Sequence, residues 1–268
     1  MINVTLLGTG GSAGVPMIGG PDGAGDWGEC DPADPRNRRT RASILIQQGL
    51  IERGGMALLV DTSPEMREQL LACRVARVDA ILYTHAHADH ILGLDDVRIL
   101  NRIVDRPLDA FGTEATLAEL RERFPYAFAA WQPPGFFRPV MVPRPIAPGD
   151  MVDTAGMSVR LFDQDHGFTH TLGLRVGGFA YSTDVVDLDD AAFATLEGVD
   201  TWVVGCFQRH AHRTHAWLPR VLGWAERARP RRTVLTHMGP DMDFSWLSNR
   251  LPVGVEPGYD GMVLEVPG

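Results

Sequence analysis

Short apolar runs recur along the chain and alternate with stretches of helical periodicity. The runs predict strands over residues 2–7, 42–47, 56–61, 79–83, 157–162, 172–176, 179–183, 200–205, 232–236 and 261–265. Helices are predicted after Ser63-Pro64, where Ser caps and Pro fits the first turn, and over residues 91–100, 113–124, 188–196 and 215–228. Because helices lie between the runs of strands, we expect two sheets covered by helices on both outer faces, an α/β fold of the four-layer αββα sandwich type.

Two segments show neither the strand-like nor the helix-like spacing of apolar residues. Residues 15–40 follow a Gly-rich turn and are rich in Gly, Pro, Asp and Arg, which predicts a long loop at an active-site face. Residues 125–150 contain seven prolines and predict an extended excursion or lid. Gly8, Gly10 and Ala13 have the form of a dinucleotide-binding fingerprint, but the residues after them do not predict the helix that would receive a pyrophosphate. We therefore reject that interpretation.

Length and composition indicate one globular domain over residues 1–268, with 44% hydrophobic and 22% charged residues and no evident linker. The first residues resemble no secretory leader and no apolar run is long enough to span a membrane, so we expect a cytoplasmic protein. Three widely spaced cysteines argue against a disulfide framework. The formal net charge of −9 disfavours binding to long nucleic acid, whereas a small anionic substrate needs only a local pocket.

Four metal-capable side chains lie in six residues directly after the predicted strand 79–83. They are His85, His87, Asp89 and His90. In an extended turn His85 and His87 point the same way, whereas Asp89 and His90 can turn toward a second point. A polar surface turn is the alternative, but it does not explain why three of the nine histidines gather here. Zinc, manganese and iron all accept these ligands, so the pattern predicts a metal site without identifying the metal.

At these residues the sequence resembles the metallo-β-lactamase superfamily, whose metal motif has the form HxHxDH. The resemblance spans nearly the whole chain, and more narrowly it is similar to PhnP-type phosphodiesterases, which open a phosphoribosyl cyclic phosphate. Further motifs fall in the family's order: Gly8-Thr9-Gly10-Gly11, Asp61, Asp165-His166-Gly167, Ser182-Thr183-Asp184, Leu235-Thr236-His237 and Gly258-Tyr259-Asp260-Gly261-Met262.

The resemblance implies two divalent metal ions, manganese or zinc. It assigns His85, His87 and His166 to one ion, Asp89, His90 and His237 to the other, and Asp184 as the bridge between them. Two such ions, roughly 3.5 to 4 Å apart, would hold a bridging hydroxide for in-line attack on phosphorus. Asp61 is expected to orient a ligand from behind or to be a buried structural aspartate; both are open, and one does not exclude the other.

A second histidine group, His210, His212 and His215, precedes the predicted helix 215–228, for which Thr214 is the expected N-cap. The resemblance implies that His215 acts at the phosphodiester, as a general acid or by stabilising charge. We expect His215 and Asp89 to carry the catalytic roles and His212 to contact substrate. The alternative, that these histidines only line the rim, stays open, most strongly for His210.

The segment 36–41 places four arginines in six residues, and arginine matches phosphate oxygens well. Arg39 and Arg41 are therefore the expected phosphate contacts, although a solvated charge run is an equal alternative in a chain that contains no lysine. Some PhnP-type enzymes carry an extra structural metal on several cysteines of this loop. Here the loop contains only Cys30, and Met238-Gly239-Pro240 follows His237, so we predict no structural zinc.

The expected function is hydrolysis of a small cyclic or linear phosphodiester, with a small phosphorylated molecule as partner and a homodimer left open. A tRNA 3′-processing-type nuclease and a thioester hydrolase of the same fold are the enzymatic alternatives. A metal-containing nucleotide-binding protein without activity is the alternative from another class, and the complete set of metal-capable residues argues against it.

Overall fold

The computed structural model describes residues 1–49, 54–130 and 140–267. In the first sheet the strand order is β14-β1-β2-β3-β4-β5-β6, and in the second it is β13-β12-β11-β10-β9-β8-β7. The strands of the first sheet are β1 (Ile2–Gly8), β2 (Ser43–Gln48), β3 (Met56–Val60), β4 (Ala80–Leu82), β5 (Leu108–Gly112), β6 (Met141–Pro145) and β14 (Val263–Val266). Those of the second are β7 (Met151–Thr154), β8 (Met157–Asp165), β9 (His170–Val176), β10 (Phe179–Ser182), β11 (Thr201–Gly205), β12 (Arg232–Thr236) and β13 (Val255–Pro257).

The two sheets face each other because their strands alternate apolar side chains between two buried faces. In β2, Ile44 and Ile46 point into the core between the sheets, where they meet side chains of β8 to β11. Leu45, between them, points to the opposite face and joins a second core beneath helices. A period of two with both faces buried requires a layer on each side of the sheet.

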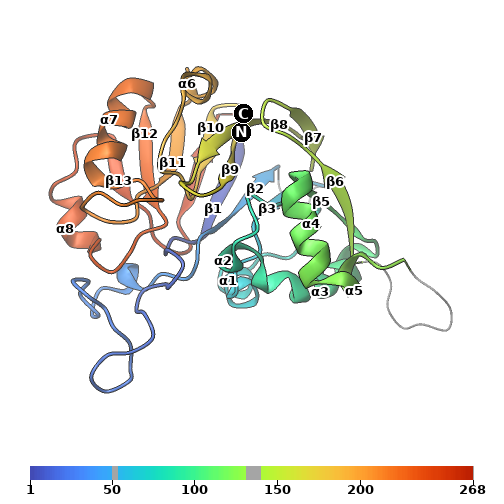
Figure 1. Cartoon of the computed structure of the whole chain (residues 1–268), viewed down its shortest axis with the longest axis horizontal. Coiled ribbons are helices and arrows are strands. Elements are labelled where there is room, and N and C mark those ends of the chain that lie inside the picture. Colours follow the sequence, from blue (N-terminus) through green and yellow to red (C-terminus); the bar gives the residue numbers. More distant parts are fainter. Residues whose placement is uncertain (50–53, 131–139, 268) are drawn as a thin grey trace.

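Helices supply the two outer layers, as Figure 1 shows. The first sheet is covered by α1 (Met66–Ala72), α2 (Ala88–Ile91), the 3₁₀ segment Leu92–Asp96, α3 (Val97–Val104), α4 (Glu114–Arg123) and α5 (Pro125–Phe128). The second is covered by α6 (Asp190–Leu196), α7 (Leu218–Ala228) and α8 (Phe244–Ser248), whose apolar residues pack on Trp202 and Leu235. The predicted four-layer αββα sandwich is therefore confirmed.

Several local predictions need correction. The lid over 125–150 is wrong for its described parts, since α5 begins it and β6 joins the sheet edge beside β5; residues 131–139 lie outside the described chain. The predicted helix 91–100 is broken by the 3₁₀ segment into α2 and α3. Strands β5, β6, β7 and β13 were not predicted.

Both capping predictions are also wrong. Helix α1 begins after Glu65, and the Ser63 hydroxyl instead donates to Gln69 Oε1 at 2.8 Å. Helix α7 begins after Trp217, with a proline in its first turn, so Thr214 lies in the preceding loop. The loop before α7, which carries Thr214 and His215, is therefore not part of the helix.

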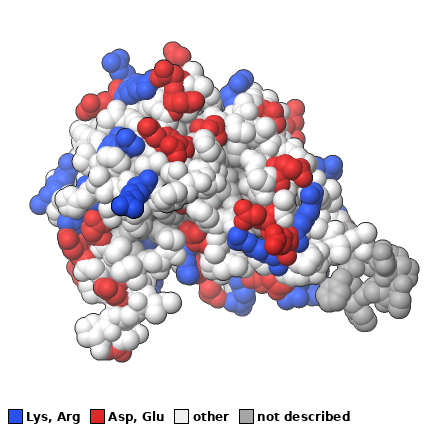
Figure 2. Space-filling view, viewed as in Figure 1, with Lys and Arg blue, Asp and Glu red and all other residues white. Residues whose placement is uncertain are grey.

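The long segment 15–40 is mostly irregular, with one short 3₁₀ turn at Pro35–Asn37. None of the helices in the described ranges is long and apolar enough to cross a membrane. On the face drawn in Figure 2, acidic and basic side chains lie interspersed.

Candidate metal centre and substrate pocket

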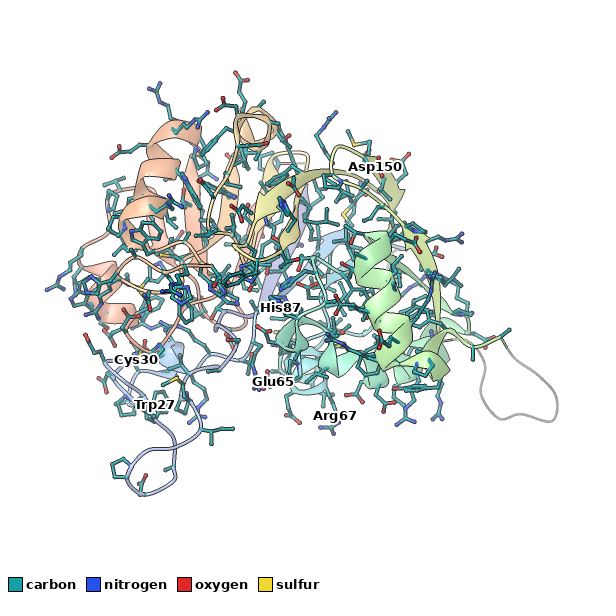
Figure 3. All side chains as sticks on the ribbon, in the orientation of Figure 1. Trp27, Cys30, Glu65, Arg67, His87 and Asp150 are labelled. Atoms are coloured by element: carbon teal, nitrogen blue, oxygen red, sulfur yellow. The ribbon has the colours of Figure 1, made fainter. Side chains whose placement is uncertain are left out.

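Each predicted ligand follows the end of a strand, and the strands come from both sheets. His85 to His90 follow β4, His166 follows β8, Asp184 follows β10 and His237 follows β12. Figure 3 places His87 at the centre of the molecule, between the two halves. Loops at strand ends are where α/β folds assemble their sites, because a rigid sheet positions short connecting segments precisely.

Three side chains at the centre stand on strained backbone. Asp61, Asp184 and His237 have φ angles of 64°, 46° and 53°, in the left-handed region that residues other than glycine seldom adopt. Each lies within two residues of a strand end. Such strain of about 1 to 3 kcal/mol per residue persists where packing and hydrogen bonds over-determine it, and it gathers at functional sites.

The side chains form two groups that share one carboxylate. His85, His87, His166 and Asp184 make one group, and Asp89, His90, His237 and Asp184 make the other; within each, candidate ligand atoms lie within 4.8 Å of one another. Asp184 Oδ1 faces the first group, at 3.9 Å from His85 Nε2 and 3.7 Å from His166 Nε2. Its Oδ2 faces the second, at 3.0 Å from His90 Nε2 and 3.2 Å from His237 Nε2.

Three of the ring nitrogens that face Asp184 lie near its carboxylate but have no hydrogen bond within the described part of the protein. Among the described residues, the Nε2 atoms of His85, His90 and His237 are buried without a hydrogen-bond partner. Unpaired buried polar atoms are costly and rare in native proteins, so several converging on one carboxylate indicate a missing binding partner. Imidazole and carboxylate donors suit divalent ions such as zinc and manganese, and these residues fit two of them.

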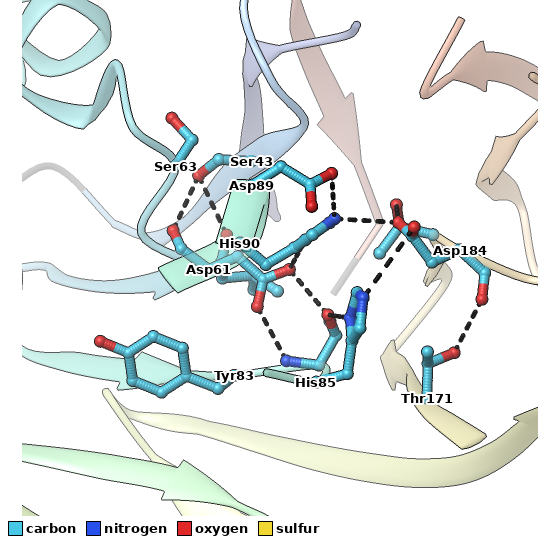
Figure 4. A network of polar contacts seen from close by, with 12 residues as sticks. Ser43, Asp61, Ser63, Tyr83, His85, Asp89, His90, Thr171 and Asp184 are labelled. Carbon is cyan, nitrogen blue, oxygen red and sulfur yellow. Dashed lines mark hydrogen bonds and ion pairs between the residues drawn. The ribbon is translucent and has the colours of Figure 1, made fainter. Parts of the chain in front are cut away.

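The opposite ring nitrogens are held by hydrogen bonds from behind, as Figure 4 shows for the Asp61 network. His90 Nδ1 pairs with Asp61 Oδ2 at 2.7 Å, and Thr84 Oγ1 donates to the same oxygen at 2.8 Å. His85 Nδ1 lies 3.0 Å from Thr84 Oγ1, and His166 Nδ1 lies 2.6 Å from the Thr214 carbonyl. Protonation at Nδ1 leaves the Nε2 lone pair free for a metal. Asp61 therefore orients a ligand ring and is also a buried, hydrogen-bonded aspartate, so both roles that the sequence left open are compatible with the structure.

Burial and charge shift the protonation of these groups in opposite directions. Burial holds the pKa of His85 well below its ordinary value, and it lowers the pKa of His166 to about 4. For His90, burial opposes the charged form, but the carboxylates of Asp184, Asp61 and Asp89 overcome it and raise its pKa well above normal. Burial also opposes the charge of Asp184, yet His237 and His90 hold its pKa well below the usual range. Dense opposing charges of this kind mark functional sites.

A pocket of about 300 Å³ opens onto both groups. His215 forms part of its wall, and its Nε2 lies 3.2 Å from Asp184 Oδ1 while its Nδ1 lies 2.9 Å from Thr214 Oγ1. The described residues that line the pocket are Ser12, His87, Asp89, His166, Phe168, Thr169, Asp184, Thr214 and His215.

Sequence reasoning missed Ser12, Phe168, Thr169 and Thr214. Ser12 comes from the Gly-rich turn after β1, and this turn was the only signal that pointed to it. A side chain at Gly8 could not be accommodated there, since a Cβ would lie 2.1 Å from the Arg41 carbonyl oxygen. The close approach of two backbones at Gly8 thus brings the first loop of the chain to the pocket.

The predicted phosphate contacts at Arg39 and Arg41 need correction, since neither lines the pocket. Arg39 is 2% exposed, and its guanidinium donates to the Met242 carbonyl at 2.6 Å and to Asn37 Oδ1 at 3.2 Å. Arg41 is paired with the Glu65 carboxylate. Each guanidinium has partners within the fold, and although the buried Nε atom of each has none among the described residues, neither side chain lines the pocket.

His212 and His210 are set back from the pocket. His212 Nδ1 lies 3.3 Å from His215 Nδ1, and its ring packs beside Phe207 at 5.0 Å between centroids. His210 is exposed, and its carbonyl accepts from Gln208 Nε2. His212 therefore supports His215 rather than lining the pocket itself.

Comparisons with known proteins agree with this architecture. A family model described as a beta-lactamase superfamily domain matches residues 57–238. A solved structure described as a new diphosphatase from the PhnP family is 32% identical, covers 100% of this chain and 98% of its own, and superposes with a TM-score of 0.88.

Two curated relatives are longer than this chain. An octanoyltransferase of Porphyromonas gingivalis (strain ATCC BAA-308 / W83) is 29% identical over 259 residues, which are 96% of this chain and 50% of that protein. A ribonuclease Z of Bradyrhizobium sp. (strain ORS 278) is 27% identical over 141 residues, 52% of this chain and 44% of that protein. The chain thus spans about half the length of the curated relatives it matches. With the family match over residues 57–238, the full-length similarity to the PhnP-family structure and the two ligand groups, the chain belongs to the metallo-β-lactamase superfamily as a hydrolase of the PhnP type.

Proposed function

We propose that the protein is a metal-dependent phosphodiesterase that hydrolyses a small cyclic or linear phosphodiester. The observation that carries the proposal is the position of His215, with Nε2 3.2 Å from the carboxylate that both ligand groups share. An imidazole there stands beside any phosphate bound at the centre. It can supply the proton that a leaving alkoxide needs.

His85, His87, His166 and Asp184 are proposed to hold one divalent ion, and Asp89, His90, His237 and Asp184 the other. When bound, two zinc or manganese ions would neutralise the charge of the phosphate and polarise its oxygens. The surrounding residues position the ligands. Asp184 is shared by the two groups, and Asp61 and Thr84 fix the rings of His90 and His85, respectively.

The proton steps fall to the residues that line the pocket. The attacking water bonds to phosphorus as the P–O ester bond breaks and gives up one proton by way of Asp89, while His215, in its imidazolium form, donates its Nε2 proton to the departing oxygen and is left neutral. The contact between Thr214 Oγ1 and His215 Nδ1 fixes the ring in that orientation. Asp89, with a side chain that is 12% exposed at the pocket, accepts a hydrogen bond from the attacking water and orients it.

The pocket favours a small substrate over a polynucleotide. Its volume of about 300 Å³ is at the lower end of small-molecule sites. Of the described residues that line it, none is lysine or arginine, and a polynucleotide grip depends on many such contacts. Because a relative of this chain is a ribonuclease Z, nuclease activity is the alternative proposal for this protein.

A panel of substrates tests the proposal. The protein, loaded with manganese or zinc, is incubated with a nucleoside 2′,3′-cyclic phosphate, glycerol 1,2-cyclic phosphate, a linear dinucleotide, a diphosphate-linked dinucleotide and an octanoyl thioester. The diphosphate is included because of the PhnP-family relative, and the thioester because of the octanoyltransferase. We expect metal-dependent release from the phosphodiesters. Cleavage of the thioester alone would refute the proposal and leave the fold family intact.

Substituting His215 by Ala tests the proton donor. Turnover should fall by about 10²- to 10⁴-fold, as for loss of a general acid, with bound metal unchanged by elemental analysis. His210→Ala is the matched control, because His210 is exposed and outside the pocket lining. Full turnover in His215→Ala with its metal retained would remove the catalytic role.

A further inference from the structure

The turn between β8 and β9 places an aromatic side chain at the mouth of the pocket. His166 points inward from this turn as a candidate ligand, and Phe168, two residues later, lines the same pocket. The turn is held by three hydrogen bonds: His166 N donates to the Thr169 carbonyl at 2.9 Å, Phe168 N to the His166 carbonyl at 3.1 Å, and Gly167 N to Asp165 Oδ1 at 2.6 Å. Phe168 is therefore presented from a fixed backbone.

Gly167 packs this turn against the loop that carries His215. Its φ of +84° is left-handed, and a Cβ there would lie 2.9 Å from Thr214 Cγ2. The close packing keeps the Phe168 turn and the proposed proton donor in one fixed arrangement. A group held by Phe168 is thereby placed relative to the reacting phosphate.

Phe168 is exposed to a degree that no internal contact explains. In the described part of the chain, the exposed aromatic side chains are Tyr126, at 36%, and Phe168, at 89%. Tyr126 has a partner, since its hydroxyl donates to Asp95 Oδ1 at 2.8 Å. A phenyl ring left in water at the rim of a site gains about 1.5 to 3 kcal/mol when something apolar covers it fully.

The size and lining of the pocket indicate which part of a substrate contacts the Phe168 ring. About 300 Å³ accommodates a small molecule, and Phe168 is part of the lining, so a substrate whose phosphate lies at the ligand groups can reach the ring. The deep end is polar and acidic, with Asp89 and Asp184, whereas Phe168 offers a flat apolar face. With divalent ions held by these carboxylates and the histidines, the deep end would attract an anionic phosphate, so a molecule that matches both ends has a phosphate and a planar ring.

We propose that Phe168 is a specificity-determining residue that stacks on the planar heterocycle of a nucleotide-like substrate. This inference rests on the proposed function for the reaction itself. It adds that the enzyme selects phosphodiesters that carry a base over those that carry only a sugar or glycerol. Stacking of a base on an aromatic side chain contributes enough to affinity to produce such a preference, whatever the base.

Two cyclic phosphates separate stacking from phosphate binding. Adenosine 2′,3′-cyclic phosphate carries a base and glycerol 1,2-cyclic phosphate does not. Phe168→Ala should raise KM for the adenosine compound about tenfold, equivalent to about 1.4 kcal/mol, and leave KM for the glycerol compound unchanged. Phe168→Trp should restore the lower KM. Tyr126→Ala, an exposed aromatic outside the pocket lining, should change neither.

A binding measurement keeps this inference separate from the reaction. Calorimetry on the manganese-loaded protein compares adenosine 5′-monophosphate with ribose 5-phosphate. We expect the adenosine compound to bind about tenfold more tightly, and Phe168→Ala to abolish that difference. If neither cyclic phosphate is cleaved but this preference is found, the proposed reaction fails and the stacking role stands. Equal binding of the two ligands, or an equal rise in KM for both cyclic phosphates, overturns the stacking role.

Discussion

The buried histidine cluster and the arginine segment 36–41 are both dense groups of chemically capable side chains, yet the fold treats them in opposite ways. In the cluster, His85, His90 and His237 keep Nε2 atoms that the described residues leave without a hydrogen-bond partner. In the arginine segment each guanidinium has at least one contact within the protein, although the buried Nε atoms of Arg39 and Arg41 have no hydrogen-bond partner among the described residues. Arg36 pairs with Asp34 at 2.8 Å, Arg38 lies over the Trp27 ring, and Arg39 and Arg41 have the partners described above.

The difference is where the unpartnered atoms lie: those of the histidine cluster converge on the Asp184 carboxylate, whereas those of Arg39 and Arg41 belong to guanidinium groups that have other partners outside the pocket lining. A donor or acceptor that already has a partner must lose it to bind a ligand, whereas a buried atom without one gains from binding. Figure 3 shows the same division in space, with His87 at the centre and Trp27 and Cys30 in the loop below it. Residue type alone would suggest a ligand site in both places, and the contacts leave only the histidine cluster available.

The largest expected effect comes from breaking the cluster at its shared carboxylate. Asp184→Ala removes the oxygens that face both ligand groups, so both sites should lose affinity. Turnover should fall by about 10³-fold, because two metals supply several kcal/mol of charge stabilisation. Elemental analysis should show loss of bound metal, and manganese should no longer raise the melting temperature, as a ligand that binds only the folded state would.

Asp163→Ala is the matched control for that experiment. Asp163 is an exposed aspartate of the same sheet, paired with His170 at 2.7 Å, and lies outside both ligand groups. Metal content and turnover should stay at the unsubstituted level. An Asp184→Ala protein that retained both metals and full activity would contradict the bridging role.

The second effect is on stability and distinguishes the buried Arg39 from the exposed Arg36. Arg39→Met keeps much of the buried volume but removes the donors to the Met242 carbonyl and to Asn37 Oδ1. Leaving buried acceptors unsatisfied should lower the free energy of unfolding by about 3 kcal/mol, measured by urea titration of the metal-loaded protein. KM for the phosphodiester should not change.

Arg36→Met provides the comparison within the same segment. Arg36 is largely exposed, and an exposed pair such as Arg36–Asp34 contributes about 0 to 1 kcal/mol. A rise in KM for Arg39→Met with unchanged stability would restore the phosphate role and remove the contrast between the two regions.

The sequence predicted the interior of the fold better than its edges. Strands such as β2 and β12 are buried and apolar, and their runs were found nearly at their observed bounds. Of the four missed strands, β6, β7 and β13 each lie at the edge of a sheet, and the short strand β5 lies between β4 and β6. Edge strands are short, carry prolines such as Pro143 and Pro145, or expose side chains such as Met151, so the alternating pattern fades.

The site residues also differ in how far the sequence could predict them, depending on whether they are adjacent in the chain or brought together by the fold. His85 to His90 are adjacent in the chain, and their spacing alone predicted a metal site. His166, Asp184 and His237 are single residues on separate strand ends, and only the family's motif order indicated them. No pattern could predict Phe168 or Ser12 at the pocket, because loops that are distant in the chain place them there. Nor could the run of arginines predict that the Arg39 guanidinium would donate to a backbone carbonyl, that of Met242, which is distant in the chain.

The smallest expected effect separates a surface ion pair from a phosphate contact. Arg41 and Glu65 retain 30% and 23% side-chain exposure, so Arg41→Met should lower the free energy of unfolding by only about 0.5 to 1 kcal/mol. A double-mutant cycle with Glu65→Gln should recover most of that energy as the coupling between the two side chains. The coupling should shrink in 1 M salt, where screening shortens the reach of exposed charges to about 3 Å.

Kinetic measurements test whether Arg41 contacts phosphate: KM should stay constant in Arg41→Met and in the double variant. A tenfold rise in KM in Arg41→Met alone would mean that Arg41 leaves Glu65 to bind phosphate, and the arginine segment would then belong to the site.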